Sequence, residues 1–76
     1  MWIMSGFKTR KEYIVERLDK GHTIRRETEK HYYEYCKVNK GVFVRSLTFD
    51  SGVVCEKIIS YNKALRILVR NFNEIK

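Results

Sequence analysis

Three cations near the end of the chain have the spacing of a shared anion-binding surface. Lys63, Arg66 and Arg70 recur at i, i+3 and i+7, which places them on one face of a helix. Guanidinium groups bind phosphate oxygens in a fork, and Lys adds a compact point charge. This basic stripe is a candidate contact for a phosphate-bearing polymer, and a solvated helix face is the alternative.

A second cluster of cations lies near the beginning of the chain. Lys8, Arg10 and Lys11 surround the expected first turn of a helix, where free backbone amides also attract anions. Cations are unfavourable at that end of the helix dipole. The cluster therefore indicates an external phosphate as a second candidate ligand site.

Aromatic and cationic residues also mix in the middle of the chain, within three β-favouring runs. If both turns between these runs contain three residues, Tyr35, Arg45 and Lys57 form one row across a sheet. Aromatic faces stack on bases and cations neutralise phosphates, so the row is a further candidate surface. Packing is the alternative role for Tyr35, because Tyr is a good strand former that is often half-buried.

The same pairing predicts which side of the sheet the helices cover. The face expected beneath them is the opposite one, with Cys36, Val38, Val42, Val44, Val54 and Ile58. Apolar residues such as Leu47 and Ile59 fall on the first face, so neither side is purely apolar. A turn that differs by one residue would exchange the partners of an entire strand.

No residue spacing indicates catalysis or metal binding. His22, His31, Cys36 and Cys55 lack a paired ligand spacing such as C-x-x-C, and no glycine-rich phosphate loop is present. A chain of 76 residues also has little room to enclose a pocket. We therefore expect a protein that is not an enzyme and has no catalytic residue, metal or cofactor.

Local patterns predict the first elements of the fold. Residues 1–7 are an apolar N-terminal arm, and Thr9 and Glu12 have the spacing of a capping box. The helix that follows is predicted over 10–20 and ends before Gly21. The segment 22–30 is highly charged, and its sequence is compatible with a short edge strand, a helical turn or a loop. An exposed strand or a loop is favoured.

Residues 31–60 predict a sheet, and the rest of the chain predicts a helix. The turns Asn39-Lys40-Gly41 and Asp50-Ser51-Gly52 each end in a glycine suited to positive φ. Ser60 is the natural N-cap of a helix over 61–75, where apolar residues recur with helical period. The expected fold is one α+β domain of order α-β-β-β-α, with a three-stranded antiparallel meander packed against the C-terminal amphipathic helix.

This order of elements resembles two families of nucleic-acid-binding domains. It is similar in topology to the double-stranded RNA-binding domain, and a three-stranded sheet followed by one helix looks like the arm-type DNA-binding domains of phage integrases. The first family begins its last helix with a lysine-rich motif, whereas Ser60-Tyr61-Asn62-Lys63-Ala64 contains one lysine. The resemblance covers element order alone and assigns no residue a role.

Composition favours an anionic partner inside the cell. Sixteen Lys and Arg against nine Asp and Glu give a formal charge of +7. Such a field speeds encounters with nucleic acids or acidic protein surfaces and does not choose between them. Two cysteines are too few for a secreted disulfide framework, and no apolar run is long enough to cross a membrane, so we expect a cytoplasmic protein.

These observations predict a small basic module that binds DNA or RNA, mainly through phosphates. The candidate contacts are Lys8, Arg10, Lys11, Tyr35, Arg45, Lys57, Lys63, Arg66 and Arg70. The alternative is a protein-interaction module, either a homodimer or an inhibitor or adaptor of a larger acidic partner. In that case Trp2, Ile3 and the tyrosines would be the anchors, since aromatic residues are enriched at interface hot spots.

Overall fold

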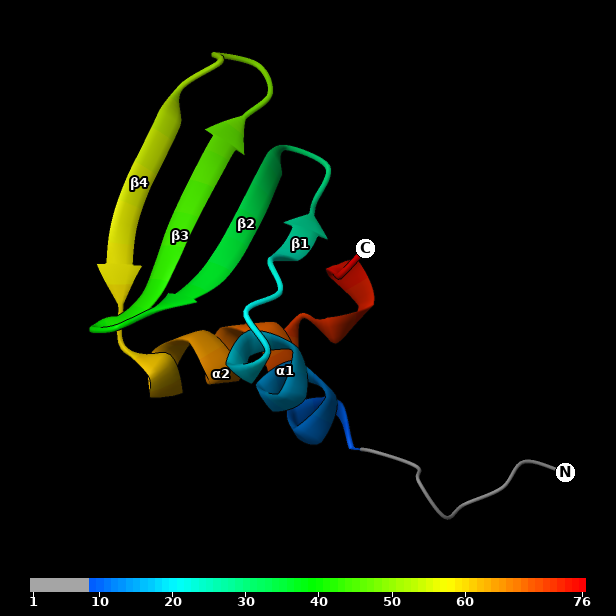
Figure 1. Ribbon diagram of the computed structural model, residues 1–76. Coiled ribbons are helices and arrows are strands. Elements are labelled where there is room, and N and C mark those ends of the chain that lie inside the picture. The colour runs from blue at the N-terminus through cyan, green and yellow to red at the C-terminus, as the bar shows by residue number, and fades with distance from the viewer. Residues whose placement is uncertain (1–8) are drawn as a thin grey trace, which may run out of the picture.

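A computed structural model describes residues 9–76 as two helices and one four-stranded sheet (Figure 1). The elements in chain order are α1 (Arg10–Asp19), β1 (Ile24–Glu27), β2 (His31–Val38), β3 (Gly41–Thr48), β4 (Val54–Ile59), α2 (Tyr61–Arg70) and the 3₁₀ helix η1 (Phe72–Glu74). The strands are antiparallel in the order β1-β2-β3-β4. The fold is therefore α+β. Lys8 and the expected arm over 1–7 lie outside the described residues.

The prediction of three strands was wrong, because part of the segment 22–30, to which the sequence assigned no single secondary structure, forms β1. This strand pairs with β2 from Ile24 opposite Tyr35 to Glu27 opposite Tyr32. Ile24 and Arg26 are buried, whereas the residues that alternate with them are exposed. Because one of the two buried positions is an arginine, the segment lacks the apolar alternation by which a strand is recognised.

The helix starts follow local sequence signals. The capping box is confirmed: the Glu12 amide donates to Thr9 Oγ1 (3.1 Å), and the Thr9 amide donates to Glu12 Oε1 (2.9 Å). At the start of α2, Ser60 Oγ accepts from the Lys63 amide (3.1 Å). Helix α2 ends at Arg70 instead of continuing to residue 75, since Asn71 leaves the helical conformation and its side chain donates back to the Ile67 carbonyl (2.8 Å).

Both hairpin turns differ in length from the prediction. The β2–β3 turn has two residues, 39 and 40, because Val38 pairs with Gly41. The second turn has four residues, 49–52, because the Thr48 amide donates to the Val53 carbonyl (2.9 Å). Gly41 has φ +147°, and a side chain there would overlap the backbone of Ile59. Its glycine therefore permits close approach of two strands in addition to forming the turn.

The shorter first turn and longer second turn each shift the pairing by one residue. Tyr35 pairs with Val44, and Val44 pairs with Lys57. Arg45 pairs instead with Glu34 and Glu56. The predicted row of Tyr35, Arg45 and Lys57 is therefore wrong, since Arg45 lies on the opposite face from the other two.

We call the face of the sheet toward the helices the inner face and the other the outer face. Val42 and Val44 are on the inner face as predicted, and they are buried with Tyr35 and Ile59. The remaining predicted inner residues were assigned wrongly. The outer face holds Cys36, Val38, Val54 and Ile58.

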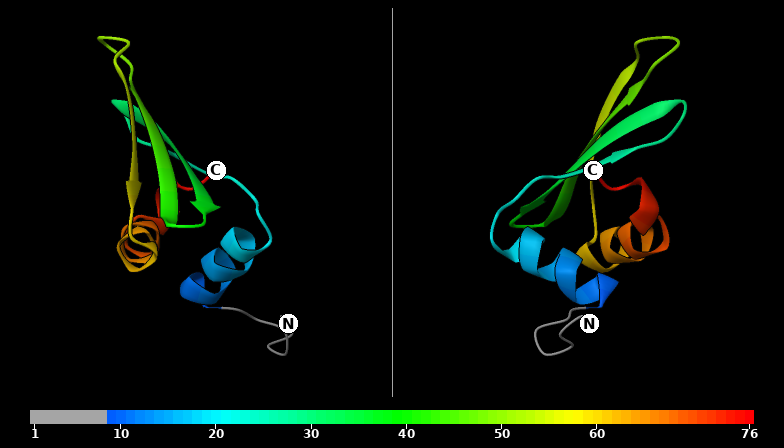
Figure 2. Two further views of the ribbon diagram at one scale, coloured as in Figure 1. Left: turned by 60° about the vertical axis from the view of Figure 1, so that its left-hand side comes forward. Right: turned by 90° about the vertical axis from the view of Figure 1, so that its right-hand side faces the viewer.

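The core lies between the inner face and the two helices, at one end of the sheet. Figures 1 and 2 show α1 and α2 side by side below that end, while the tip of the β3–β4 hairpin extends beyond them. The buried apolar residues are Ile14, Leu18, Ile24, Tyr35, Val42, Val44, Ile59, Ala64, Leu65 and Leu68. The first five residues of β4 remain exposed, since Val54, Glu56 and Ile58 lie on the outer face and the two inner-face residues, Cys55 and Lys57, lie outside the buried cluster.

Candidate functional site

A groove between α1 and α2 brings together cations from both ends of the chain. It has a volume of about 580 Å³ and is lined by Lys11, Asn62, Leu65, Arg66, Val69 and Arg70. Leu65 is buried and Val69 is half-buried, so apolar side chains contribute to a wall that also carries three cations. We call this feature the basic groove.

Helix packing explains why these cations meet. Ile14 and Leu18 of α1 join Leu65 and Leu68 of α2 in one buried cluster, which holds the two helices beside each other. Lys11 is one turn before Ile14, and Arg66 follows Leu65 directly. The apolar stripes that build the core therefore set the distance between two clusters of cations that are far apart in the sequence.

The groove cations have no counter-charge within the described residues. Of the ion pairs that residues 9–76 form with one another, none includes Lys11, Arg66 or Arg70. Arg66 and Arg70 are also four residues apart on α2, where like charges repel. An anion in the groove would relieve this repulsion and replace the water around three cations.

Two further predicted cations lie close to this region without lining the groove. The Arg10 guanidinium lies over the Phe72 ring, 5.2 Å from its centroid, and the Tyr13 ring forms a T-shaped pair with the same Phe72 ring. Lys63 is exposed in the first turn of α2. Lys8 lies outside the described residues, so its predicted role stays a prediction.

The three predicted site residues of the sheet do not form one surface. Tyr35 is 2% exposed and its hydroxyl accepts from Arg26, so its ring cannot stack on a base. Arg45 projects from the outer face and pairs with Glu56 (Nε to Oε2, 3.6 Å). Lys57 is exposed on the inner face of the sheet, opposite Val44. The sheet therefore lacks the predicted mixture of aromatics and free cations.

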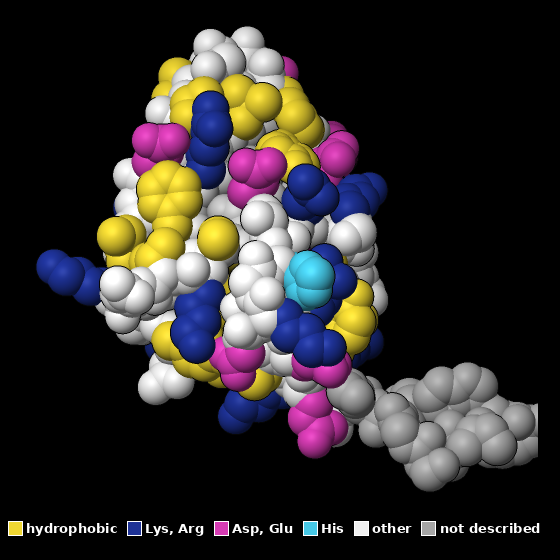
Figure 3. All heavy atoms as spheres, viewed as in Figure 1, with side chains coloured by type: hydrophobic (Ala, Val, Ile, Leu, Met, Phe, Trp, Pro, Cys, Tyr) yellow, Lys and Arg dark blue, Asp and Glu magenta, His cyan; other side chains and the backbone are white. Residues whose placement is uncertain are grey.

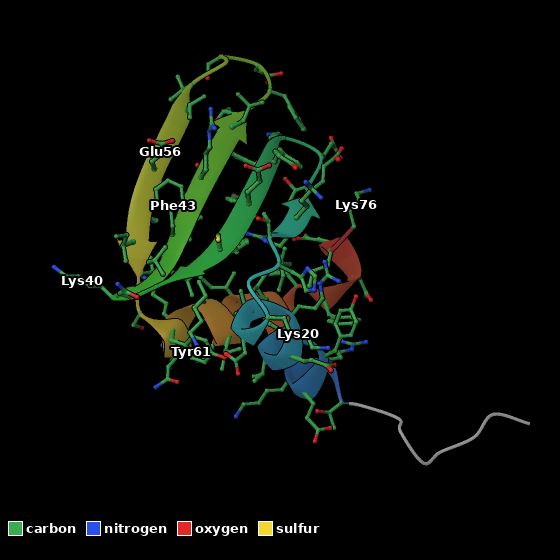
Figure 4. All side chains as sticks on the ribbon, viewed as in Figure 1. Lys20, Lys40, Phe43, Glu56, Tyr61 and Lys76 are labelled. Carbon is green, nitrogen blue, oxygen red and sulfur yellow. The ribbon has the colours of Figure 1, made fainter. Side chains whose placement is uncertain are left out.

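The outer face instead combines compensated charges with apolar residues. One row crosses all four strands and consists of Arg25, Glu34, Arg45 and Glu56. Arg25 approaches Glu34 (3.9 Å), and Tyr32 donates its hydroxyl proton to the same carboxylate (3.2 Å). In Figure 3 hydrophobic side chains lie among acidic and basic ones over the strands, and in Figure 4 Phe43 and Glu56 project from this face.

The buried Arg26 is a polar centre that the sequence did not reveal. It is 8% exposed, and its Nε and Nη2 donate to the Tyr35 hydroxyl (3.2 and 3.0 Å). Its Nη1 donates to Glu74 Oε1 (2.5 Å), and the guanidinium centre lies 4.0 Å from the Tyr33 ring centroid. Since these partners engage all three of its nitrogens, Arg26 has a structural role.

The Arg26 contacts also affect ionisation. Burial lowers the pKa of Arg26, but the bonds to Tyr35 and Glu74 outweigh burial and raise that pKa overall. Burial raises the pKa of Tyr35 above its ordinary value, although the nearby guanidinium opposes the increase. The buried centre thus consists of the Arg26 cation with a neutral phenol and a carboxylate bound to it. The pairing of β1 with β2 brings Arg26 to Tyr35, and η1 brings Glu74, which is 48 residues beyond Arg26.

No metal site was found among residues 9–76, where no three His, Cys, Asp or Glu side chains gather around one point. Cys36 and Cys55 are free thiols on opposite faces of the sheet. Within the same residues, neither helix has the length and apolar character needed to cross a membrane.

Comparisons of the chain with protein-family models, curated proteins and solved structures found no match. The fourth strand also changes the element order on which the topological resemblance was based. Function must therefore be argued from the surfaces of this fold.

Proposed function

We propose that this chain is a small, non-enzymatic nucleic-acid-binding module, and that phosphates of the nucleic acid bind in the basic groove. The observation that carries the proposal is the convergence of Lys11, Arg66 and Arg70, none of which is neutralised by a carboxylate of residues 9–76. Phosphate contacts release condensed counterions, which is the main source of affinity in such complexes.

The groove suits the backbone of a nucleic acid better than its bases. Arg66 and Arg70 can each hold a phosphate in a fork, and Lys11 adds a charge from the opposite wall. The groove supplies few groups that could read base edges, so its selectivity among sequences is weak. Arg10 and Lys63 extend the cationic surface at either side of this contact. An intracellular location fits this role and the two free cysteines.

The test compares the groove with the sheet at equal change of charge. We expect the double variant Arg66→Glu/Arg70→Glu to bind labelled duplex and single-stranded DNA and RNA more than about tenfold more weakly. The matched control is Lys40→Glu/Lys57→Glu, which makes the same change in net charge at two exposed lysines, one in the β2–β3 turn and one in β4. Its affinity should stay within about threefold of the parent.

Salt dependence provides a second measurement of the same contact. Three phosphate contacts predict a slope of log affinity against log salt of about −3 for a duplex, and the groove variant should lose about two units of it. The proposal is wrong if the parent binds no nucleic acid at low salt. It is also wrong if the sheet control loses as much affinity as the groove variant, because the effect would then be one of net charge alone.

A further inference from the structure

The outer face of the sheet carries apolar side chains on both sides of its charged row, and neither helix covers them. On it, a row of Cys36, Phe43 and Ile58 lies on one side of the charged row, and a row of Tyr32, Leu47 and Val54 lies on the other, where Glu27 continues it on β1. Ile58 is 54% exposed and Val54 is 48% exposed. Exposed apolar residues gathered on one face of a small chain are typical of a site of association.

The charged row between them has an unusual symmetry. From β1 to β4 its signs alternate as plus, minus, plus, minus, because the row consists of Arg25, Glu34, Arg45 and Glu56. Reversing the order of an even alternating row exchanges every positive position with a negative one. The row is therefore complementary to its own reversed copy.

We propose that the outer face binds a second copy of this chain, with a two-fold axis parallel to the strands. That axis places β1 opposite β4 of the second copy and β2 opposite β3. Arg25 then faces Glu56 of the second copy, and Glu34 faces Arg45 of the second copy. A two-fold axis along the charged row would instead oppose like charges. The charge pattern thus selects one isologous arrangement.

The same operation brings the apolar residues of β2 and β3 together at the axis, and it leaves Val54 opposite Glu27 at the rim. An axis along the strands leaves each row at its own height, so Phe43 meets Cys36 of the second copy and Leu47 meets Tyr32. Two such faces can pack as a sandwich with aligned strands, about 10 Å apart. In this arrangement each carboxylate of the charged rows has guanidinium groups as neighbours, and each guanidinium has carboxylates. Their attraction offsets the loss of hydration.

Charge complementarity is what points to a second copy as the occupant. A different partner would need only its own pattern opposite this face, whereas a self-associating face needs a row that matches its reversal. Pairing through the free edge of β4 is less favourable when centred on Glu56 or Lys57, because it then opposes like charges across the two copies. The two basic grooves would remain accessible in the dimer, because the helices lie on the faces of the sheets away from the contact.

The decisive experiment uses two charge-reversal variants. Two copies of the same variant should repel each other, whereas one copy of each should attract. Arg45→Glu places two acidic residues at the centre of the row, and Glu34→Arg places two basic ones there. Each variant should sediment as a monomer over about a hundredfold concentration range in which the parent is a dimer. In an equimolar mixture, every position of one variant row faces its opposite in the other, so a heterodimer should form.

The mixture also controls for folding, because a misfolded variant would not restore the dimer. The proposal is overturned if the parent is a monomer throughout that range. It is also overturned if the single variants dimerise as the parent does, which would place the contact at the β4 edge or elsewhere. A mixture that stays monomeric despite native circular dichroism spectra would likewise contradict it.

A second pair of variants tests the apolar rows. Phe43→Ser should raise the dimer dissociation constant by more than about tenfold, because Phe43 lies next to the axis. Phe49→Ser is the matched control, since Phe49 is 43% exposed in the β3–β4 turn, outside the rows. Equal weakening by both variants would show that the outer face is not the contact.

Discussion

The basic groove and the outer sheet face both carry cations, but they arrange them in opposite ways. In the groove, Arg66 and Arg70 lie beside each other with no carboxylate partner among residues 9–76. On the sheet, Arg25 and Arg45 each lie next to a glutamate. The positive charge that remains without a neighbouring carboxylate is thus in the groove and not on the outer face. A count of basic residues alone does not locate it.

The comparison separates cations that hold the fold from cations that are available to a ligand. Arg26 is the extreme of the first kind, since it is buried and fully engaged. Removing a partner of such a cation should cost stability. Removing a groove cation should cost binding and leave the fold intact.

The largest expected loss of stability follows removal of the Arg26 carboxylate partner. Glu74→Ala leaves a buried guanidinium without its counter-charge, which should lower the free energy of unfolding by about 2 kcal/mol. Urea denaturation followed by circular dichroism measures this loss. A change no larger than that of a surface pair would mean that Arg26 is not held by Glu74.

Alkaline pH should weaken the same centre. The folded-state pKa of Tyr35 is raised by burial, so its neutral form is favoured by folding and contributes stability below the ordinary pKa of about 10. This stability is lost as pH rises through the folded-state pKa. Denaturation at pH values on both sides of 10 should therefore show a steeper alkaline decline in the parent than in Tyr35→Phe. Equal declines would place the effect in other tyrosines.

A surface pair of the outer face should matter much less to the folded monomer. Glu56→Gln removes the carboxylate beside Arg45, and both side chains are about half exposed. We expect the free energy of unfolding to change by less than about 0.5 kcal/mol, because water screens such pairs. Measurement at low protein concentration keeps association out of the comparison. A loss as large as that of Glu74→Ala would remove the distinction between the two kinds of ion pair.

The smallest effect is expected to have the opposite sign. Arg66→Ala removes a like-charge pair four residues apart on α2 and introduces a better helix former, so stability should rise by about 0.3 kcal/mol. The same variant should bind nucleic acid more weakly. Thermal denaturation and a binding titration on one preparation measure both quantities. A variant that loses stability would show that Arg66 supports the fold.

Local signals predicted where both helices begin, whereas the sheet register depended on distant contacts. The cap of α1 involves only Thr9 and Glu12, so it is visible in four consecutive residues. The register depends on Gly41, which has to lie against Ile59, eighteen positions later in the sequence. No local rule states that this glycine serves a close strand contact as well as a turn.

The candidate site was predicted in parts. Lys11, Arg66 and Arg70 were selected from the sequence, but as members of two separate clusters, and only the packing of α1 on α2 joins them. Arg26 was missed because its partners come from β2 and η1. From sequence alone, a charged residue within a strand is predicted to be exposed. Its burial becomes apparent only when the positions of the neighbouring strand and of the C-terminal turn are known.

The placement of Cys36 and Cys55 on opposite faces gives the chain two intrinsic chemical reporters. Cys36 is half-buried among the apolar side chains of the outer face, and Cys55 is exposed on the other side of the sheet. An uncharged alkylating reagent would therefore modify each thiol at a rate set by what covers its own face. The ratio of the two rates, followed by mass spectrometry, shows which face is occupied in the unaltered protein.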